Sequence, residues 1–329
     1  MRSLTWGILF SLPLMWSAAA IGKDLSPREI YEQVAPGVVM VMGYADGGGK
    51  GSGGTGSIIQ SDGLVLTNAH VVIEEQTGKP YARLSVFRKP ARVTGESKSD
   101  LSRMARAKVL AYSQPLDLAL LKLDGVTEVL PVVDLSESGL ARIGDHVVAI
   151  GHPEQGGLWT LTTGVISAEV DNFNGVRGKH VFQTETGLNR GNSGGPLLDG
   201  EGHMVGVNTA IARVAPDGLP ITSISFSLKS SVATKWLKEQ GVTLRGTQLP
   251  AGQTQPVTDQ PPAQPAQPQP KPVSPPQAEL PLKPTVKPQV IQPAPVRPYN
   301  LDELISDRAK AEADLDSMMS EMRGRMKGR

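Results

Sequence analysis

The chain has 329 residues, a net charge of +1 and no cysteine. This length allows one large β domain or two ordinary domains with extensions. The near-zero charge gives no overall field toward nucleic acid or a membrane surface, and the lack of cysteine excludes a disulfide framework, a thiolate metal site and a lipid-modified N-terminal cysteine.

The first twenty residues have the layout of a secretory signal peptide. Arg2 precedes an apolar run that ends in three alanines, Ala18 to Ala20, and Pro13 within the run favours cleavage over an uncleaved membrane anchor. No other stretch is long and apolar enough to span a bilayer. We therefore expect residues 1–20 to be removed and the mature protein to be exported without a membrane span, to the periplasm or alternatively outside the cell.

Residues 24–245 are predicted to form an all-β domain. Short β-branched runs, separated by glycine, proline and aspartate, occur at 37–43, 56–72, 116–123, 145–151 and 203–211. Such spacing is typical of a barrel or sandwich. Ser61-Asp62-Gly63 predicts a hairpin turn between two alternating strands.

Two helices are expected within this domain. One begins after Ser26, which can act as the N-cap while Glu29 completes a capping box. The other covers residues 230–241. Between the first helix and the middle of the domain, residues 79–108 carry nine Lys/Arg side chains against Glu96 and Asp100. That stretch is either a patch for an anionic partner or a solvated basic loop.

After the predicted domain, the composition changes abruptly. Residues 250–298 contain 16 of the 27 prolines, which predicts an extended, disordered linker. Residues 300–329 then predict an amphipathic helix capped by Asn300, with Glu303 offering a second capping box. The helix cannot bury its narrow, mostly apolar stripe alone, so we expect the stripe to pair with another copy or, preferably, to dock on another envelope protein. The alternative is a frayed tail that has no partner. The stripe consists of Leu301, Leu304, Arg308, Ala311, Leu315, Met318 and Met322.

The GNSGGP sequence at 191–196 contains a candidate nucleophile, Ser193. A nucleophilic serine needs a base, a carboxylate that orients the base, and N–H groups aimed at the developing oxyanion. His70 follows a predicted strand and Asp117 precedes a buried one, in the chain order of chymotrypsin-like enzymes. Gly191 lets the loop turn so that the Gly191 and Ser193 N–H groups can form an oxyanion hole. Each motif alone could be structural, but together they favour a serine nucleophile.

At these motifs the chain resembles the protease domain of HtrA/Deg serine proteases. TNAHVV, DLALLKL and GNSGGP, with ARIGDHVVAIGHP and TTGVISA between them, carry a resemblance that extends over residues 30–237. It implies a chymotrypsin/trypsin-like fold of two six-stranded antiparallel β-barrels, with the catalytic residues between them. It also implies cleavage of unfolded or damaged envelope proteins, with Ser193 as nucleophile, His70 as general base and Asp117 as orienting carboxylate. Polypeptides are the implied substrates, and neither a cofactor nor a metal is implied.

The resemblance also suggests a substrate pocket. Its base, six residues before the nucleophile, is Gly187, and its wall is Ser225, Phe226 and Ser227. With no carboxylate at 187, we expect a preference for small or medium aliphatic side chains before the cut bond.

Two departures from the family pattern stand out. The proline-rich tract begins where HtrA/Deg proteins usually carry PDZ domains, so no PDZ domain is recognised here. Residues 151–153 read GHP where the family usually has GNP, and His152 has no assigned role. An inactive binding or chaperone-like module, or an envelope scaffold acting through the tail, remains the alternative function, and oligomerisation stays open.

Overall fold

The computed structural model describes residues 24–45, 51–135, 141–154, 156–211, 224–244, 300, 302–308 and 310. The predicted signal peptide (1–20) and proline-rich linker (250–298) lie outside these residues. So does most of the predicted C-terminal helix. No helix in the described ranges is long and apolar enough to cross a membrane.

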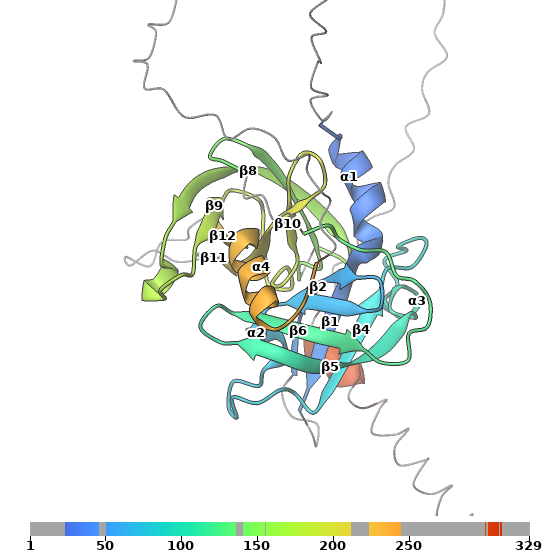
Figure 1. Cartoon of the computed structure of the whole chain (residues 1–329). Coiled ribbons are helices and arrows are strands. Elements are labelled where there is room, and N and C mark those ends of the chain that lie inside the picture. The colour runs from blue at the N-terminus through green and yellow to red at the C-terminus, as the bar shows by residue number, and fades with distance from the viewer. Residues whose placement is uncertain are drawn as a thin grey trace, which may run out of the picture. The chain divides into compact units, whose positions relative to one another are not determined.

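Twelve strands form two closed antiparallel barrels, which confirms the expected double-barrel fold. Figure 1 shows the blue-to-teal strands in one barrel and the green-to-yellow strands in the other. The first barrel, in spatial order β1-β2-β3-β6-β5-β4, consists of β1 (Val38–Tyr44), β2 (Gly51–Gln60), β3 (Leu64–Thr67), β4 (Arg83–Arg88), β5 (Met104–Ser113) and β6 (Leu118–Leu123). The second, in order β10-β11-β12-β9-β8-β7, consists of β7 (His146–Gly151), β8 (Thr160–Val170), β9 (Val181–Thr184), β10 (Pro196–Leu198), β11 (Met204–Ile211) and β12 (Ser225–Lys229).

The short apolar runs of the sequence become strands with one face inside a barrel. Some strands are buried on both faces, and the longest of these is β1, all seven of whose residues are buried. Val39 and Val41 point into the first barrel's core, while Met40 and Met42 pack in a separate cluster with Phe87. A strand covered on both faces reads as a continuous apolar run, and VVMVMGY does.

The predicted hairpin and helices are present. Gly63 adopts a left-handed φ of 93° at the turn between β2 and β3, a conformation that glycine adopts without strain. Helix α1 (Pro27–Val34) begins at Ser26 with the capping box formed: Ser26 N–H donates to Glu29 Oε2 at 2.7 Å and Glu29 N–H to Ser26 Oγ at 3.3 Å. Helix α4 (Ser230–Glu239) buries Trp236 and Leu237.

Shorter helical elements connect the strands. They are the 3-10 turns η1 (Ala35–Gly37) and η2 (Phe173–Gly175) and the single-turn helices α2 (Ala69–Val72) and α3 (Ser97–Asp100).

The basic stretch at 79–108 is not a free loop. It contains β4, α3 and the first part of β5. Asp100 is fully buried and accepts hydrogen bonds from the N–H groups of Thr94 and Gly95 at 2.8 Å. Arg88 pairs with Glu128, and the Lys89 ammonium lies 5.5 Å from the Tyr31 ring centroid. Two of the basic side chains in this stretch, Arg88 and Lys89, therefore contact other residues of the same domain.

The start of the C-terminal segment contacts the first barrel. Residues 302–308 are helical, and Asn300 Oδ1 accepts from Asp302 N–H at 3.0 Å and Glu303 N–H at 3.2 Å, which confirms Asn300 as the N-cap. Ile305, which the predicted stripe omits, is only 4% exposed and packs with Met40, Met42, Tyr44 and Phe87. Residues 302–308 therefore contact the first barrel of their own chain, a contact that the sequence did not predict. The later residues of the stripe lie outside the described part.

Candidate active site

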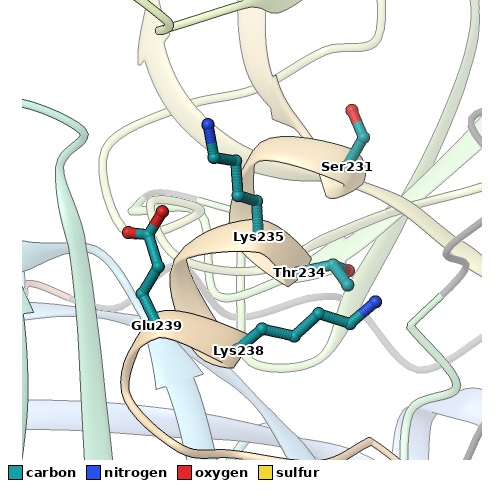
Figure 2. A pocket seen from close by; sticks show the side chains of 5 residues that line it. All are labelled: Ser231, Thr234, Lys235, Lys238 and Glu239. Carbon is teal, nitrogen blue, oxygen red and sulfur yellow. The ribbon is translucent and has the colours of Figure 1, made fainter.

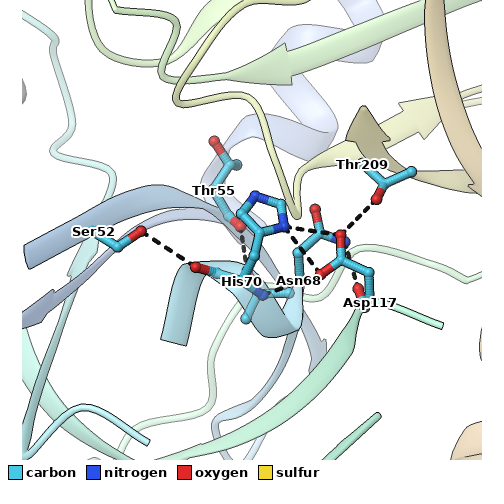
Figure 3. Close-up of polar contacts among 7 residues, drawn as sticks. Ser52, Thr55, Asn68, His70, Asp117 and Thr209 are labelled. Carbon is cyan, nitrogen blue, oxygen red and sulfur yellow. Dashed lines mark hydrogen bonds and ion pairs between the residues drawn. The ribbon is translucent and has the colours of Figure 1, made fainter. Parts of the chain in front are cut away.

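The structure brings His70 and Asp117 into direct contact. His70 lies on α2, just after β3, and Asp117 lies just before β6 in the first barrel. The Nδ1 atom of His70 is 2.8 Å from Asp117 Oδ2 and 3.0 Å from Oδ1, and the His70 backbone N–H donates to Oδ1 at 3.0 Å (Figure 3). Asp117 has a φ of 59°, a left-handed conformation that Asp tolerates better than most residues.

A third residue, Thr209 of β11, supports Asp117 from the second barrel. Its hydroxyl donates to Asp117 Oδ2 at 2.6 Å, and Asn68 Nδ2 donates to the Asp117 carbonyl at 2.7 Å (Figure 3). Sequence reasoning missed Thr209, because a threonine inside a strand has no motif of its own.

Burial and hydrogen bonding act in opposite directions on Asp117. Burial alone would raise the pKa of Asp117, but the hydrogen bonds from His70 and Thr209 outweigh it and hold that pKa below its usual value. The ionised carboxylate only accepts hydrogen bonds, so Nδ1 of His70 carries the proton and Nε2 is left as a proton acceptor. The His70 side chain is 48% exposed, whereas that of Asp117 is 15% exposed. This is the arrangement that a general base and its orienting carboxylate require.

The loop that carries Ser193 packs against the turn that carries His70. Thr55 N–H donates to the Ser193 carbonyl at 2.8 Å. A Cβ added to Gly194 would lie 2.2 Å from Thr67 Oγ1 and 2.8 Å from the Asn68 nitrogen, so only glycine allows this approach. The Ser193 hydroxyl, however, makes no hydrogen bond to His70 or to any other residue in the described part of the chain. Such contacts are often long in a free enzyme and tighten with substrate.

The backbone around Gly191 leaves two N–H groups available. Glu154 N–H donates to the Arg190 carbonyl at 2.6 Å. The Gly191 N–H belongs to the same trans peptide group as that carbonyl, so it points the opposite way. Within the described ranges, neither the Gly191 N–H nor the Ser193 N–H has an acceptor. Gly191 itself has a φ of 97°, which glycine adopts readily. These features suit the predicted oxyanion hole.

Comparison with known proteins gives the family. A family model described as a trypsin-like peptidase domain matches residues 54–207, the stretch that contains all three candidate catalytic residues. A probable periplasmic serine endoprotease, DegP-like, of Rickettsia conorii is 36% identical over 201 residues, which cover 59% of this chain and 35% of that protein. The magnetosome formation protease MamE of Paramagnetospirillum magneticum is 35% identical over 190 residues, covering 57% of this chain and 23% of that protein.

A solved structure agrees with these relatives. The HtrA-type protease AlgW with tripeptide superposes with a TM-score of 0.52 at 29% identity, covering 66% of this chain and 65% of that one. The chain contains a trypsin-like protease domain of the HtrA type. It spans about a third of the length of the Rickettsia relative.

In this HtrA-type domain, Thr55 and His152 fix the carbonyl of Gly191. The Thr55 hydroxyl donates to Gly191 O at 2.6 Å, and it accepts from the His152 backbone N–H at 3.2 Å. His152 Nδ1 lies 3.0 Å from the same hydroxyl, whose single proton is already used, so Nδ1 is the donor. Neither residue was predicted to act in the site, although the GHP departure pointed to His152.

His152 is a neutral, fully buried histidine. Burial lowers the pKa of His152 to about 3. Its ring meets the edge of Trp159 at a centroid distance of 4.7 Å, and Trp159 Nε1 donates to the Val38 carbonyl at 2.8 Å. Trp159 has a φ of 49°, an uncommon conformation for a bulky residue. His152 thus ties the Gly191 loop to the packing between the two barrels.

The predicted pocket residues fall into two groups. Ser225 and Ser227 are 2% and 0% exposed, and their hydroxyls donate to Thr186 O at 3.1 Å and Asn208 Oδ1 at 2.6 Å. Both side chains therefore lie inside the second barrel, and a contact of Ser225 and Ser227 with the substrate backbone remains a prediction. The Phe226 ring lies on the other face of β12, 4.6 Å from that of Phe173.

Gly187 is exposed, and a Cβ placed there would contact only Thr162 Cγ2, at 3.9 Å. The roles of Gly187 and Phe226 in a substrate pocket remain predictions.

Two surface hollows lie elsewhere on the domain. One follows the outer face of α4 and is lined by Ser231, Thr234, Lys235, Lys238 and Glu239 (Figure 2). The second is lined by Ala141, Arg142, Glu169, Phe182, Val205, Lys229, Ser230 and Ser231. Neither contains a candidate catalytic residue. Among the residues that the structure describes, no group of three His, Asp or Glu side chains could hold a metal ion.

Proposed function

We propose that this chain is an exported serine endopeptidase that cleaves unfolded or damaged proteins of the cell envelope. The observation that carries the proposal is the Thr209–Asp117–His70 network, next to a loop whose Ser193 and Gly191 N–H groups have no acceptor among the residues that the structure describes. The trypsin-like peptidase domain supports the reaction, and the similarity to the probable periplasmic serine endoprotease of Rickettsia conorii supports the compartment.

The proposed catalytic steps are those of a Ser-His-Asp mechanism. His70 Nε2 takes the proton of the Ser193 hydroxyl as the oxygen attacks the scissile carbonyl, and Asp117 stabilises the imidazolium that forms. The Gly191 and Ser193 N–H groups bind the negative oxygen of the tetrahedral intermediate. His70 then protonates the leaving amine, and a water activated by the same imidazole hydrolyses the acyl-enzyme.

A digest of a denatured model protein tests the reaction. The wild-type chain should cut it at many sites, and mass spectrometry should place mainly small or medium aliphatic residues before the cut bonds. Ser193→Ala is the matched control and should leave the protein intact. A wild-type chain that is folded but leaves the denatured protein uncut would contradict the proposal.

One observation favours a second candidate, a protease-fold binding or chaperone-like module. The Ser193 hydroxyl is not hydrogen-bonded to His70 in this structure. The module should suppress aggregation of a denatured protein equally well as wild type and as Ser193→Ala, with no peptide products from either. For the stripe residues after 310, a contact with another envelope protein or a second copy remains our proposal.

A further inference from the structure

The helical residues 302–308 occupy a fitted site on the first barrel. Ile305 is buried against β1 and β4 residues, and the space for it exists because residue 51 is glycine: a Cβ there would lie 2.3 Å from Ile305 Cγ2. The Arg308 guanidinium lies 5.7 Å from the centre of the Phe87 ring, within the range of a cation–π contact. Residues 300–308, called here the docking segment, therefore make both an apolar and a cationic contact with the barrel.

The N-terminal end of the docking segment reaches the loop that carries Gly191 and Ser193. We call residues 190–194 the oxyanion loop. Asp302 Oδ1 lies 2.9 Å from Arg190 Nη2, and Asp302 Oδ2 lies 3.4 Å from Arg190 Nη1. The carboxylate and the guanidinium therefore form a bidentate ion pair. Glu154 Oε2 is 3.5 Å from Arg190 Nη1. The Arg190 carbonyl belongs to the peptide that carries the Gly191 N–H, and the Glu154 N–H holds that carbonyl. Asp302 and Glu154 thus both contact Arg190, the residue whose carbonyl shares a peptide group with this N–H.

We propose that the docking segment binds the first barrel of its own chain and, through Asp302 and Arg190, holds the oxyanion loop in its working orientation. This inference rests on the proposed function, because it concerns the rate of the same reaction. Asp302 is a positioning residue and touches neither substrate nor the reacting atoms. The segment binds in cis because residues 245–299, at about 3 Å per residue when extended, give ample reach, and a tethered segment has an effective concentration on the order of millimolar.

The expected effect is modest and confined to the chemical step. An ion pair whose side chains are 50% and 66% exposed is weak and is screened by salt. We expect Asp302→Asn to lower kcat about two- to fivefold, with KM unchanged, because the oxyanion contact is made only in the transition state. Asp302→Glu should restore most of the rate, and high salt should reduce the wild-type kcat toward that of Asp302→Asn.

Ile305→Asp tests the docking itself, and it lies outside the barrels, so it leaves their fold intact. Hydrogen exchange should show protected amides in 300–308 of the wild-type full chain and fast exchange in Ile305→Asp. The kcat of Ile305→Asp should fall at least as far as that of Asp302→Asn. The double variant should fall no further than Ile305→Asp, since Asp302 cannot act from an undocked segment. Glu303→Gln is the matched control, because Glu303 is an exposed acid in the same first turn with no ion pair among the described residues.

Four results would overturn the inference or its positioning role. Equally fast exchange of 300–308 in wild type and Ile305→Asp would show that the segment does not dock. Fast exchange in Ile305→Asp with an unchanged kcat would show that docking does not position the loop. Protection that appears only as the chain dimerises in sedimentation experiments would place the segment on a second copy. A wild-type chain that shows protection but neither cleaves nor reacts at Ser193 overturns the proposed function and the positioning role together, while the exchange data still measure docking.

Discussion

The hydroxyl of Thr55, on strand β2 of the first barrel, donates a 2.6 Å hydrogen bond to the carbonyl of Gly191, in the second barrel's loop that carries the candidate nucleophile Ser193. The same oxygen accepts hydrogen bonds from the backbone and ring of His152. The orientation of the oxyanion loop therefore depends on a contact between the barrels as well as on the loop sequence.

Thr55→Val should impair catalysis without removing the nucleophile. The valine fills a similar volume but donates no hydrogen bond, so the Gly191 carbonyl loses its partner and the loop can rotate. We expect kcat to fall about tenfold, with little change in KM, because a buried hydrogen bond of this kind is worth on the order of 1 kcal/mol or more. Steady-state kinetics with a peptide substrate measures this, with the exposed Thr77→Val as control. Equal kcat values for the two variants would show that the contact does not position the loop.

His152 should make the folded domain less stable as the pH falls below neutrality. Its pKa in the folded protein is about 3, below the ordinary value of 6.5, so between these values the unfolded chain binds the extra proton. The free energy of unfolding should therefore be unaffected by this group above pH 6.5 and fall below it, by about 1.4 kcal/mol per pH unit.

Urea unfolding between pH 4.5 and 8 measures the effect. His152→Asn should flatten the pH dependence relative to the wild type, although it also removes the contact with Trp159. His146→Asn, at an exposed position of β7, should keep the wild-type slope. A wild-type slope in His152→Asn would mean that the buried imidazole is not the group responsible.

Asp117→Asn should leave a folded but nearly inactive chain. The asparagine amide has one acceptor oxygen and cannot accept from both the His70 ring and the Thr209 hydroxyl, as the carboxylate does. His70 therefore takes the wrong tautomer and cannot accept the Ser193 proton. The expected loss in kcat is about 10⁴-fold, and Ser193→Ala or His70→Ala should lose as much or more. Circular dichroism checks the fold and peptide hydrolysis the rate; near-normal hydrolysis by any of these variants would refute the assigned catalytic residues.

Specificity should follow from Gly187 at the predicted base of the substrate pocket. With no carboxylate there, cleavage after Lys or Arg should be disfavoured, and Gly187→Asp should raise it, since a carboxylate at that position attracts a cationic side chain. Peptide libraries with matched sequences before and after the cut bond measure both. A wild-type preference for Lys or Arg, or a Gly187→Asp variant with an unchanged profile, would place the pocket elsewhere.

Local patterns carried most of the fold and the core of the site. The capping box at Ser26 and the hairpin turn at Gly63 each depend on residues that are close together in the chain. His70, Asp117 and Ser193 each lie in a short motif, and the order of the three motifs is visible in the sequence. The contacts of Thr209 with Asp117 and of Thr55 with Gly191 join residues 92 and 136 positions apart. Nothing local marks these threonines, because their roles exist only once both barrels have closed.

The stripe chosen for the C-terminal helix was wrong for the same reason. The predicted stripe of the C-terminal helix included Arg308 and omitted Ile305, although Ile305 makes the buried contact and Arg308 lies over the Phe87 ring. Helical spacing allows neighbouring stripes, and only the surface that receives the helix decides between them.

Labelling with a serine-directed fluorophosphonate tests the central claim most directly. The account predicts that one probe molecule attaches to Ser193 of the native full chain, located by mass spectrometry of its peptides. It also predicts that labelling is lost in Ser193→Ala and is slowed by several orders of magnitude in His70→Ala and Asp117→Asn, since both remove the activation of the hydroxyl. A folded wild-type chain that takes up no probe, or that is labelled at another residue and equally well without His70, would contradict it.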